Sequence, residues 1–230
     1  MDNYRFTFQE NQYFGECVPC TAAVFNQAID SPQTAYKTGM RQAVESAIRE
    51  GLSVENFALE KDFVRFCSKK QSEKHFQDLT LKEKLLQWAA SLKNSLPCFI
   101  FAVQAFEGAR RRLAEIKQLS GLFMFDADKL ICDPLEIYRR TQAGGFPWEV
   151  RLAHKTSSGH GLRLVCEARA ELGNIADNQI QLARDLDLMG VKGSTGKPVV
   201  DDSCIDATRI SYCPRREDIY FIDEEHLFNL

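Results

Sequence analysis

The chain has 230 residues, of which 44% are apolar and 27% charged, a composition typical of a globular protein with one large domain or two small ones. No apolar run approaches the roughly 18 residues that a membrane-spanning helix needs, and the first residues lack a basic segment followed by an apolar one, so we expect a cytoplasmic protein without a membrane partner. The net charge of −3 excludes a chain that is basic throughout, so any contact with nucleic acid must come from a local patch.

Residues 1–95 are expected to form a mainly helical region that packs on the core following it. Apolar residues recur at helical spacing over residues 40–48, and Gly51 is suited to end that helix. Thr80 and Glu83 have the spacing of a capping box, in which each side chain accepts a hydrogen bond from the other residue's backbone, and they mark the start of a further helix. The apolar faces of these helices are interpreted as core.

Cys17 and Cys20 form a CxxC pair near the start of the chain. Such a pair can be half of a zinc site or a redox pair. No second CxxC or His-x-x-x-His segment completes a zinc site, and the chain before Cys17 is too short for the strand and helix of a thioredoxin. We therefore expect the cysteines to be reduced and largely buried.

Residues 96–230 show short apolar runs that alternate with segments of helical spacing, a pattern typical of an α/β or α+β core. Strands are expected near residues 98–103, 121–126, 162–166, 199–200 and 210–212, and helices near residues 106–116, 134–140 and 180–190. Residues 190–198 are expected to form a loop, which is not a P-loop because Val191 and Pro198 stand where that motif needs a glycine and a serine or threonine. Three arginines at 110–112 fall on an expected helix and are interpreted as a solvated face, or as a contact to nucleic-acid backbone.

The strand expected at residues 121–126 ends in two carboxylates. Asp126 and Asp128 are two residues apart, so on a strand both side chains project from the same face. Two carboxylates at this spacing repel each other unless a cation lies between them, and Mg²⁺ or Mn²⁺ prefers such oxygen ligands. A strand that runs out into solvent would show the same pattern, so this pair alone leaves both interpretations open.

A third carboxylate, Asp201, follows two valines and could join the first two from a neighbouring strand. Two ions held by three carboxylates would stabilise the attacking and leaving oxygens of a phosphoryl displacement. Asp202 and Asp206 are alternatives for the third ligand, and Asp206 could instead pair with Arg209 in a turn.

The segment at residues 156–163 combines small, polar and basic residues before the strand expected at 162–166. Glycines permit a close backbone approach to a ligand, and a turn of this kind can bind phosphate through N–H groups and cationic side chains. A simple hairpin turn explains the same residues, and it stays open as the alternative. The candidate nucleotide-binding residues are Ser157, Ser158, Gly159, His160, Arg163 and, from a separate segment, Arg209.

Taken in chain order, these segments resemble the three motifs of archaeo-eukaryotic primases: an apolar strand with two aspartates, a Ser-x-His and an apolar residue followed by aspartate. The matching residues are Asp126 and Asp128, then Ser158 and His160, then Asp201. More narrowly, roughly residues 96–222 resemble the VirE N-terminal-type domain, a bacterial branch of that superfamily.

The resemblance implies an RRM-like antiparallel palm that carries the acids on adjacent strands. It implies a two-ion Mg²⁺ or Mn²⁺ site on Asp126, Asp128 and Asp201, and transfer of nucleotides from nucleoside triphosphates to a 3′-hydroxyl on a DNA or RNA template. Ser158 and His160 would contact the nucleotide phosphates. Domains of this branch often precede a helicase-like domain in proteins of mobile elements, which implies a helicase-type partner protein.

Other functions fit parts of the pattern. A haloacid-dehalogenase-type phosphatase would also place Asp126 after an apolar strand, but it requires threonine where this chain has Leu130, and it leaves the turn around His160 unexplained. A rolling-circle nuclease needs a His-x-His pair, and the four histidines are not so spaced. A palm that binds nucleotide or nucleic acid without turnover is the non-enzymatic alternative.

Overall fold

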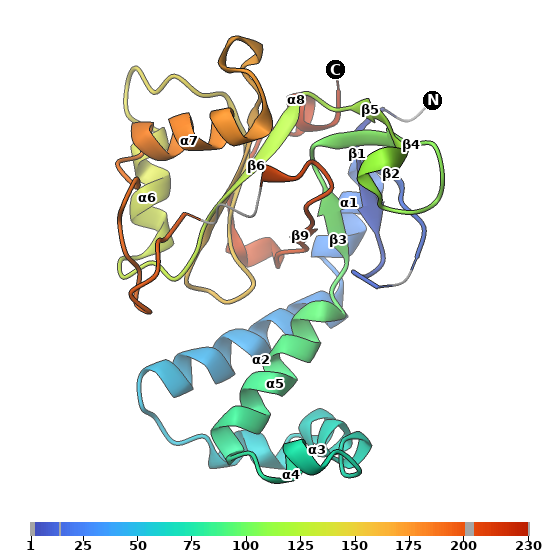
Figure 1. The fold of residues 1–230 in the computed structure, drawn as a ribbon, viewed down its shortest axis with the longest axis vertical. Helices are drawn as coiled ribbons and strands as arrows, with labels where there is room; N and C mark the ends of the chain where they lie inside the picture. The colour runs from blue at the N-terminus through green and yellow to red at the C-terminus, as the bar shows by residue number, and fades with distance from the viewer. Residues whose placement is uncertain (1–2, 14, 201–204, 230) are drawn as a thin grey trace.

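The computed structural model describes residues 3–13, 15–200 and 205–229, and it has an α+β fold (Figure 1). The strands are β1 (Tyr4–Gln9), β2 (Val18–Thr21), β3 (Cys98–Ile100), β4 (Val103–Phe106), β5 (Ile116–Leu119), β6 (Leu122–Ala127), β7 (Val150–Lys155), β8 (Leu162–Glu167), β9 (Ser211–Tyr212) and β10 (Ile219–Ile222). The helices are α1 (Ala22–Ile29), α2 (Pro32–Arg49), α3 (Lys61–Lys69), α4 (Lys74–Gln77), α5 (Leu81–Asn94), α6 (Pro134–Thr141), α7 (Ile175–Asp185) and α8 (Glu224–Phe228).

In the described residues, the strands form two four-stranded antiparallel sheets and the hairpin β4–β5. Sheet I has the order β2-β1-β3-β9, and sheet II has the order β10-β7-β8-β6. Sheet II carries the residues of interest, because its register places Asp126 of β6 opposite Arg163 of β8, and Arg163 opposite His154 of β7.

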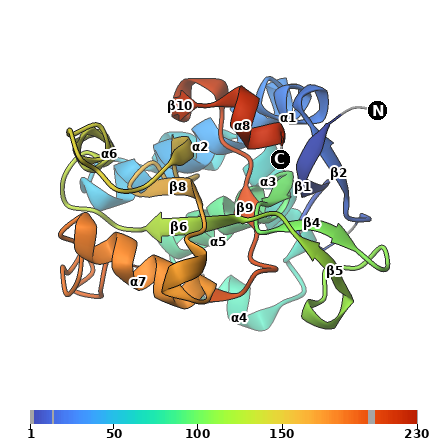
Figure 2. The same cartoon turned by 90° about the horizontal axis from the view of Figure 1, so that it is seen from above.

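Sheet II is buried on both faces, which explains why β6 is apolar along most of its length. Phe123 and Phe125 pack with Trp148 and with residues of α6 and α7. Leu122 and Met124 point the other way, into a second core shared with sheet I. Figure 2 shows the same arrangement from above, with α6 and α7 towards the left of the molecule and the strands of sheet I towards the right. Alternation along the strand therefore directs Asp126 towards the sheet I side.

Helices α2 to α5, which we call the helical lobe, extend away from the two sheets (Figure 1). The lobe has its own apolar core, in which Trp88 of α5 packs against Phe63 of α3, with Val44 of α2 beside them. The predicted capping box is confirmed, because Thr80 accepts from the Glu83 backbone and Glu83 from that of Thr80. No helix of the described ranges is long and apolar enough to cross a membrane.

The start of the chain, which precedes the mainly helical region, forms strands. Strands β1 and β2 pair with each other, and β1 also pairs with β3, so residues 4–21 belong to sheet I. The helices α1 to α5 are thus inserted between β2 and β3. Strand β1 is short and pairs with β3, about ninety residues away along the chain, as the Phe8–Phe99 pairing illustrates. Local spacing does not reveal such pairing.

The prediction of a helix at residues 106–116 is wrong. The chain there forms the hairpin of β4 and β5, with a loop that contains Arg111. Apolar residues at 106, 109, 113 and 116 happened to match the helical period, although two of them lie in separate strands that pair with each other. Strands β7 and β10 were not expected. The strands expected near residues 98, 122, 162 and 211, the helix at 134 and the loop at 190–198 are confirmed.

Cys17 and Cys20 are free thiols that belong to different apolar clusters. Cys20 packs beside Phe6, whereas Cys17 packs in the cluster of Cys98 and Ile210. Burial raises the pKa of both thiols, so both are protonated at neutral pH. Cys20 is buried as expected, whereas Cys17 is only partly buried.

Candidate functional site

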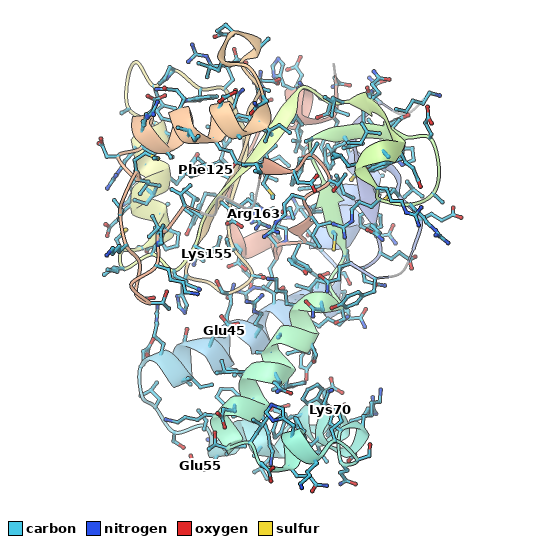
Figure 3. The ribbon with its side chains drawn as sticks, in the orientation of Figure 1. Glu45, Glu55, Lys70, Phe125, Lys155 and Arg163 are labelled. Carbon is cyan, nitrogen blue, oxygen red and sulfur yellow. The ribbon has the colours of Figure 1, made fainter. Side chains whose placement is uncertain are left out.

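A cavity of about 830 Å³ lies where the helical lobe meets the end of sheet II. Figure 3 shows this junction, with Arg163 and Lys155 on the sheet side and Glu45 of α2 on the helical side. Among the described residues that line the cavity, cations outnumber carboxylates: Arg41, Arg49, Lys93, Arg111, Lys129, Arg163 and Arg209 stand against Glu45, Asp126 and Asp128. The local basic patch that nucleic acid or nucleotide would need is therefore present, although the chain as a whole is acidic.

The two carboxylates lie where β6 ends, and both line the cavity. Asp126 is almost fully buried and forms an ion pair with the guanidinium of Arg163 on the paired strand. Arg163 also donates from Nη1 to the Ser211 hydroxyl at 3.1 Å, which ties the acid to sheet I. A positive charge beside Asp126 relieves its repulsion with Asp128 in the absence of metal.

The chain before the third predicted acid runs directly beside this pair. The Asp128 N–H donates to the Val199 carbonyl at 2.7 Å, and Val200 forms a β-bridge with Ala127. Asp201 and Asp202 lie outside the described residues. No group of three His, Cys, Asp or Glu side chains that could hold a metal occurs within residues 3–13, 15–200 and 205–229, so the three-carboxylate arrangement stays a prediction.

Asp206 is the other alternative for the third ligand, and its side chain accepts hydrogen bonds within a turn. Its Oδ1 accepts from the Thr208 backbone at 2.7 Å and from the Thr208 hydroxyl at 2.9 Å, and its side chain is exposed. The backbone of Arg209 donates to the Asp206 carbonyl at 2.9 Å, so the turn that the sequence suggested is present. Arg209 itself lines the cavity.

Residues 156–161 form the turn between β7 and β8, which confirms the hairpin interpretation and also places the turn on the cavity wall. The Thr156 N–H donates to the Gly161 carbonyl at 2.8 Å, and Gly159 has a φ of +80°. A Cβ at Gly161 would lie 2.6 Å from Asp128 Oδ1, so only glycine lets the turn approach this carboxylate so closely. The glycine thus brings Asp128 and the turn together.

His160 lies on the cavity wall with its Nε2 3.3 Å from the Ser46 hydroxyl of α2. Burial lowers the pKa of His160, and the charge of Arg49 lowers it further, against the opposing effect of Glu45. The ring is therefore a neutral imidazole at neutral pH, with one N–H to donate. Ser158 lies next to it in the turn, and its hydroxyl is 3.0 Å from that of Thr156.

The structure adds residues that the sequence did not single out, and they come from the helical lobe. Arg41 of α2 donates to the Ser157 hydroxyl at 2.6 Å and to Glu45 at 2.7 Å. Lys93 of α5 lies with its ammonium 4.7 Å from the centre of the Tyr212 ring. Both look like ordinary surface cations in the sequence, because any amphipathic helix carries such residues beside its apolar face.

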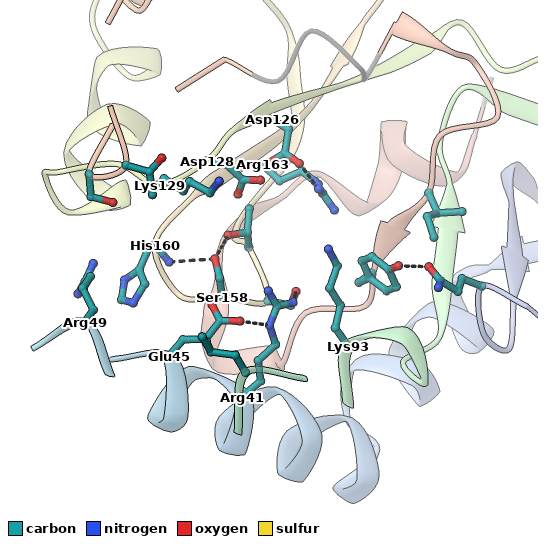
Figure 4. A pocket seen from close by; sticks show the side chains of 18 of the residues that line it. Arg41, Glu45, Arg49, Lys93, Asp126, Asp128, Lys129, Ser158, His160 and Arg163 are labelled. Atoms are coloured by element: carbon teal, nitrogen blue, oxygen red, sulfur yellow. Dashed lines mark hydrogen bonds and ion pairs between the residues drawn. The ribbon is translucent and has the colours of Figure 1, made fainter. Parts of the chain in front are cut away.

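Figure 4 shows the resulting arrangement, with Asp126, Asp128 and Arg163 facing Arg41 and Lys93 across the cavity, and with Ser158 and His160 along one side. Of the residues proposed from the sequence, Asp126, Asp128, Ser157, Ser158, His160, Arg163 and Arg209 line this one cavity. Gly159 lies in the same turn, and Asp201 cannot be placed because it is outside the described residues.

These observations define an α+β domain with a basic cavity around two strand-end carboxylates. The chain belongs to the BT4734-like, N-terminal domain family, which matches residues 91–221. This family is related to VirE N-terminal and primase-like domains. The matched segment contains Asp126, Asp128 and the turn at 156–161, whereas α2 lies outside it. No curated protein and no solved structure shows a match to the chain.

Proposed function

We propose that the cavity carries out metal-dependent nucleotidyl transfer, in which nucleotides from nucleoside triphosphates are added to a 3′-hydroxyl on a DNA or RNA template. The observation that carries the proposal is that Asp126 and Asp128 line one cavity together with the turn of Ser158 and His160. Family membership supports it, because the family is related to primase-like domains. Sheet II, covered on one face by α6 and α7, would be the RRM-like palm.

The residues fit a divalent metal in their chemistry. Asp126 and Asp128 offer the carboxylate oxygens that Mg²⁺ and Mn²⁺ prefer, and Asp201 is proposed as the third ligand. The buried Arg163 forms an ion pair with Asp126 and holds that carboxylate in one orientation. Two bound ions would stabilise the charge that develops on the attacking and leaving oxygens of the α-phosphate.

The remaining groups position the nucleotide. The neutral imidazole of His160 donates its N–H to a phosphate oxygen, and the hydroxyls of Ser157 and Ser158 add neutral donors beside it. Arg209 contributes positive charge. The proposal includes a helicase-type partner and a role in mobile-element replication, by resemblance to the VirE N-terminal-type branch.

A palm that binds nucleotide or nucleic acid without turnover is the second candidate. The observation that favours it is the ion pair of Asp126 with Arg163, because a cation already balances one of the two acids. The phosphatase has less support, since Leu130, which stands at its threonine position, is buried in the core of sheet II.

Incorporation of labelled nucleotide onto primed and unprimed templates, with Mg²⁺ or Mn²⁺, tests the proposal. Asp128→Asn is the informative variant, and we expect it to lose about 100-fold or more in incorporation, because a metal ligand contributes several kcal/mol to the barrier. Asp78→Asn removes an exposed acid of the helical lobe and is the matched control. Full activity of Asp128→Asn would refute the site, and phosphate release without incorporation would favour the phosphatase.

A further inference from the structure

Helix α2 supports the turn that is proposed to bind phosphate, although α2 lies outside the segment that matches the family. Arg41 donates to the hydroxyl of Ser157, and Ser46 lies within hydrogen-bond distance of His160. Between them, Gln42 packs so close to Gly159 that an added Cβ there would lie 3.2 Å from its Cγ. The helical lobe is therefore one wall of the site.

This wall brings two poorly hydrated cations into the cavity. The Arg41 side chain is only 11% exposed, and Glu45 is its partner on the same helix. Lys93 is held against the ring of Tyr212, and its burial lowers the pKa of its ammonium, as do the charges of Arg41 and Arg163. Asp128 and Asp126 act in the opposite direction on Lys93, so its ammonium lies within the field of all four groups.

Cations withdrawn from water and placed beside one another repel, and a multiply charged anion between them offsets that repulsion. A guanidinium can bind a phosphate through two parallel hydrogen bonds, while an ammonium acts as a point charge. Arg41 and Lys93 reach the cavity from α2 and α5, on the side opposite the acids (Figure 4). A single phosphate held at the Ser158 turn would leave part of this wall without a ligand.

We propose that Arg41 and Lys93 form a polyphosphate subsite that binds the terminal phosphates of a nucleoside triphosphate and makes the cavity select triphosphates over monophosphates. The inference rests on the proposed function in that it takes the ligand to be a nucleotide. It assigns a function to the helical lobe, for which the sequence offered none. The lobe and sheet II would then hold opposite ends of the same phosphate chain.

Equilibrium binding of ATP and of AMP to the full chain tests the subsite without any need for turnover. We expect wild-type protein to prefer ATP. Arg41→Gln and Lys93→Gln should each weaken ATP binding about tenfold or more, while AMP binding changes less than about threefold, because a charge-assisted hydrogen bond is lost only for the longer ligand. Arg65→Gln is the matched control, since Arg65 lies on α3 with its side chain 74% exposed and should leave both affinities unchanged.

The outcomes separate this inference from the proposed function. If both variants keep the wild-type ratio of ATP to AMP affinity, or lose both affinities equally, the subsite is refuted, even in a protein that incorporates nucleotide. If the ATP preference is present and falls in the variants while wild-type protein incorporates nothing, the subsite stands and nucleotidyl transfer fails. Should Arg41→Gln lose its native circular dichroism, Arg41→Lys keeps the charge, and we expect it to retain part of the ATP preference; Lys93→Gln then decides the case.

Discussion

The helical lobe and sheet II line the same cavity, yet only sheet II shows its role in the sequence. On sheet II, Asp126 and Asp128 follow a run of buried residues, and the turn around His160 precedes another, so polar groups stand out against apolar neighbours. On the lobe, Arg41 and Lys93 lie on amphipathic helices where cations are ordinary. A strand end concentrates polar residues at one place, whereas a helix distributes them along its whole solvent face.

The largest difference is expected between the effects of replacing Asp126 and Asp128 on the free energy of unfolding. The sequence alone predicts that replacing either aspartate by asparagine relieves the repulsion between the two carboxylates and leaves the fold intact. The structure separates them, because Asp126 is 2% exposed and balances the buried Arg163. We expect Asp126→Asn to lower the free energy of unfolding by about 3–5 kcal/mol, since a buried charge loses its partner. Asp128→Asn should change it by less than about 1 kcal/mol. Urea unfolding of both variants checks the difference, and equal midpoints would show that the ion pair contributes little.

A substitution in the core of the helical lobe should destabilise the lobe without changing the packing of the two sheets. Leu85 is fully buried in the lobe core, while its neighbour Leu86 is 43% exposed. Leu85→Ala should cost about 3 kcal/mol through the cavity it leaves, and Leu86→Ala less than about 1 kcal/mol. Hydrogen exchange in the Leu85→Ala variant should show faster exchange in α3 and α5 than in β6 and β8. Uniformly faster exchange would instead mean that lobe and sheets unfold as one unit.

His154 makes sheet II sensitive to acid. Burial lowers its pKa to about 3, and the charge of Arg163 adds to the shift. Below pH 6.5 His154 binds a proton in the unfolded chain, whereas its buried ring stays neutral in the folded protein. Stability is therefore lost as the pH falls. At pH 5 the loss is about 2 kcal/mol relative to pH 7. His154→Gln should remove that part of the pH dependence, as measured by urea unfolding at the two pH values. If the variant lost as much stability between pH 7 and pH 5 as the wild type, His154 would be protonated in the folded protein.

The smallest effect is expected at the start of α5. Thr80 and Glu83 close the capping box that fixes the first turn of the helix carrying Lys93. Thr80→Ala should lower stability by about 1 kcal/mol. Thermal unfolding measures this, and Thr80→Ser, which keeps the hydroxyl, should stay close to wild type. A larger loss, or a change in ATP affinity, would indicate that the cap also determines where Lys93 lies.

Strands β6 and β8 of sheet II, the turn before β8 and the start of α5 could be predicted because their signals are local. The buried run before Asp126, the turn glycines and the capping box each depend on neighbouring residues. The resemblance to the primase motifs also predicted that Asp126 and Asp128 lie near Ser158 and His160, and these four residues line one cavity.

What could not be predicted depends on contacts between distant segments. The ion pair of Arg163 with Asp126 depends on strand register, so the sequence did not reveal that this candidate nucleotide-binding arginine also balances an acid. Arg111 was assigned to a helix because apolar spacing cannot distinguish a helix from two short strands that pair. The approach of Arg41 to Ser157 spans 116 residues of sequence, and no local pattern encodes it.

The chain has two tryptophans, one in each of the regions compared above. Trp88 is buried in the core of the helical lobe, and Trp148 packs against Phe123 on the α6 and α7 side of sheet II. Replacing either indole by phenylalanine therefore leaves one tryptophan in a known place, whose emission can be excited selectively over that of the six tyrosines. Fluorescence of the two single-tryptophan proteins would report separately on lobe and sheet. Titration with nucleotide could then show whether emission changes at lower nucleotide concentration for Trp88 or for Trp148.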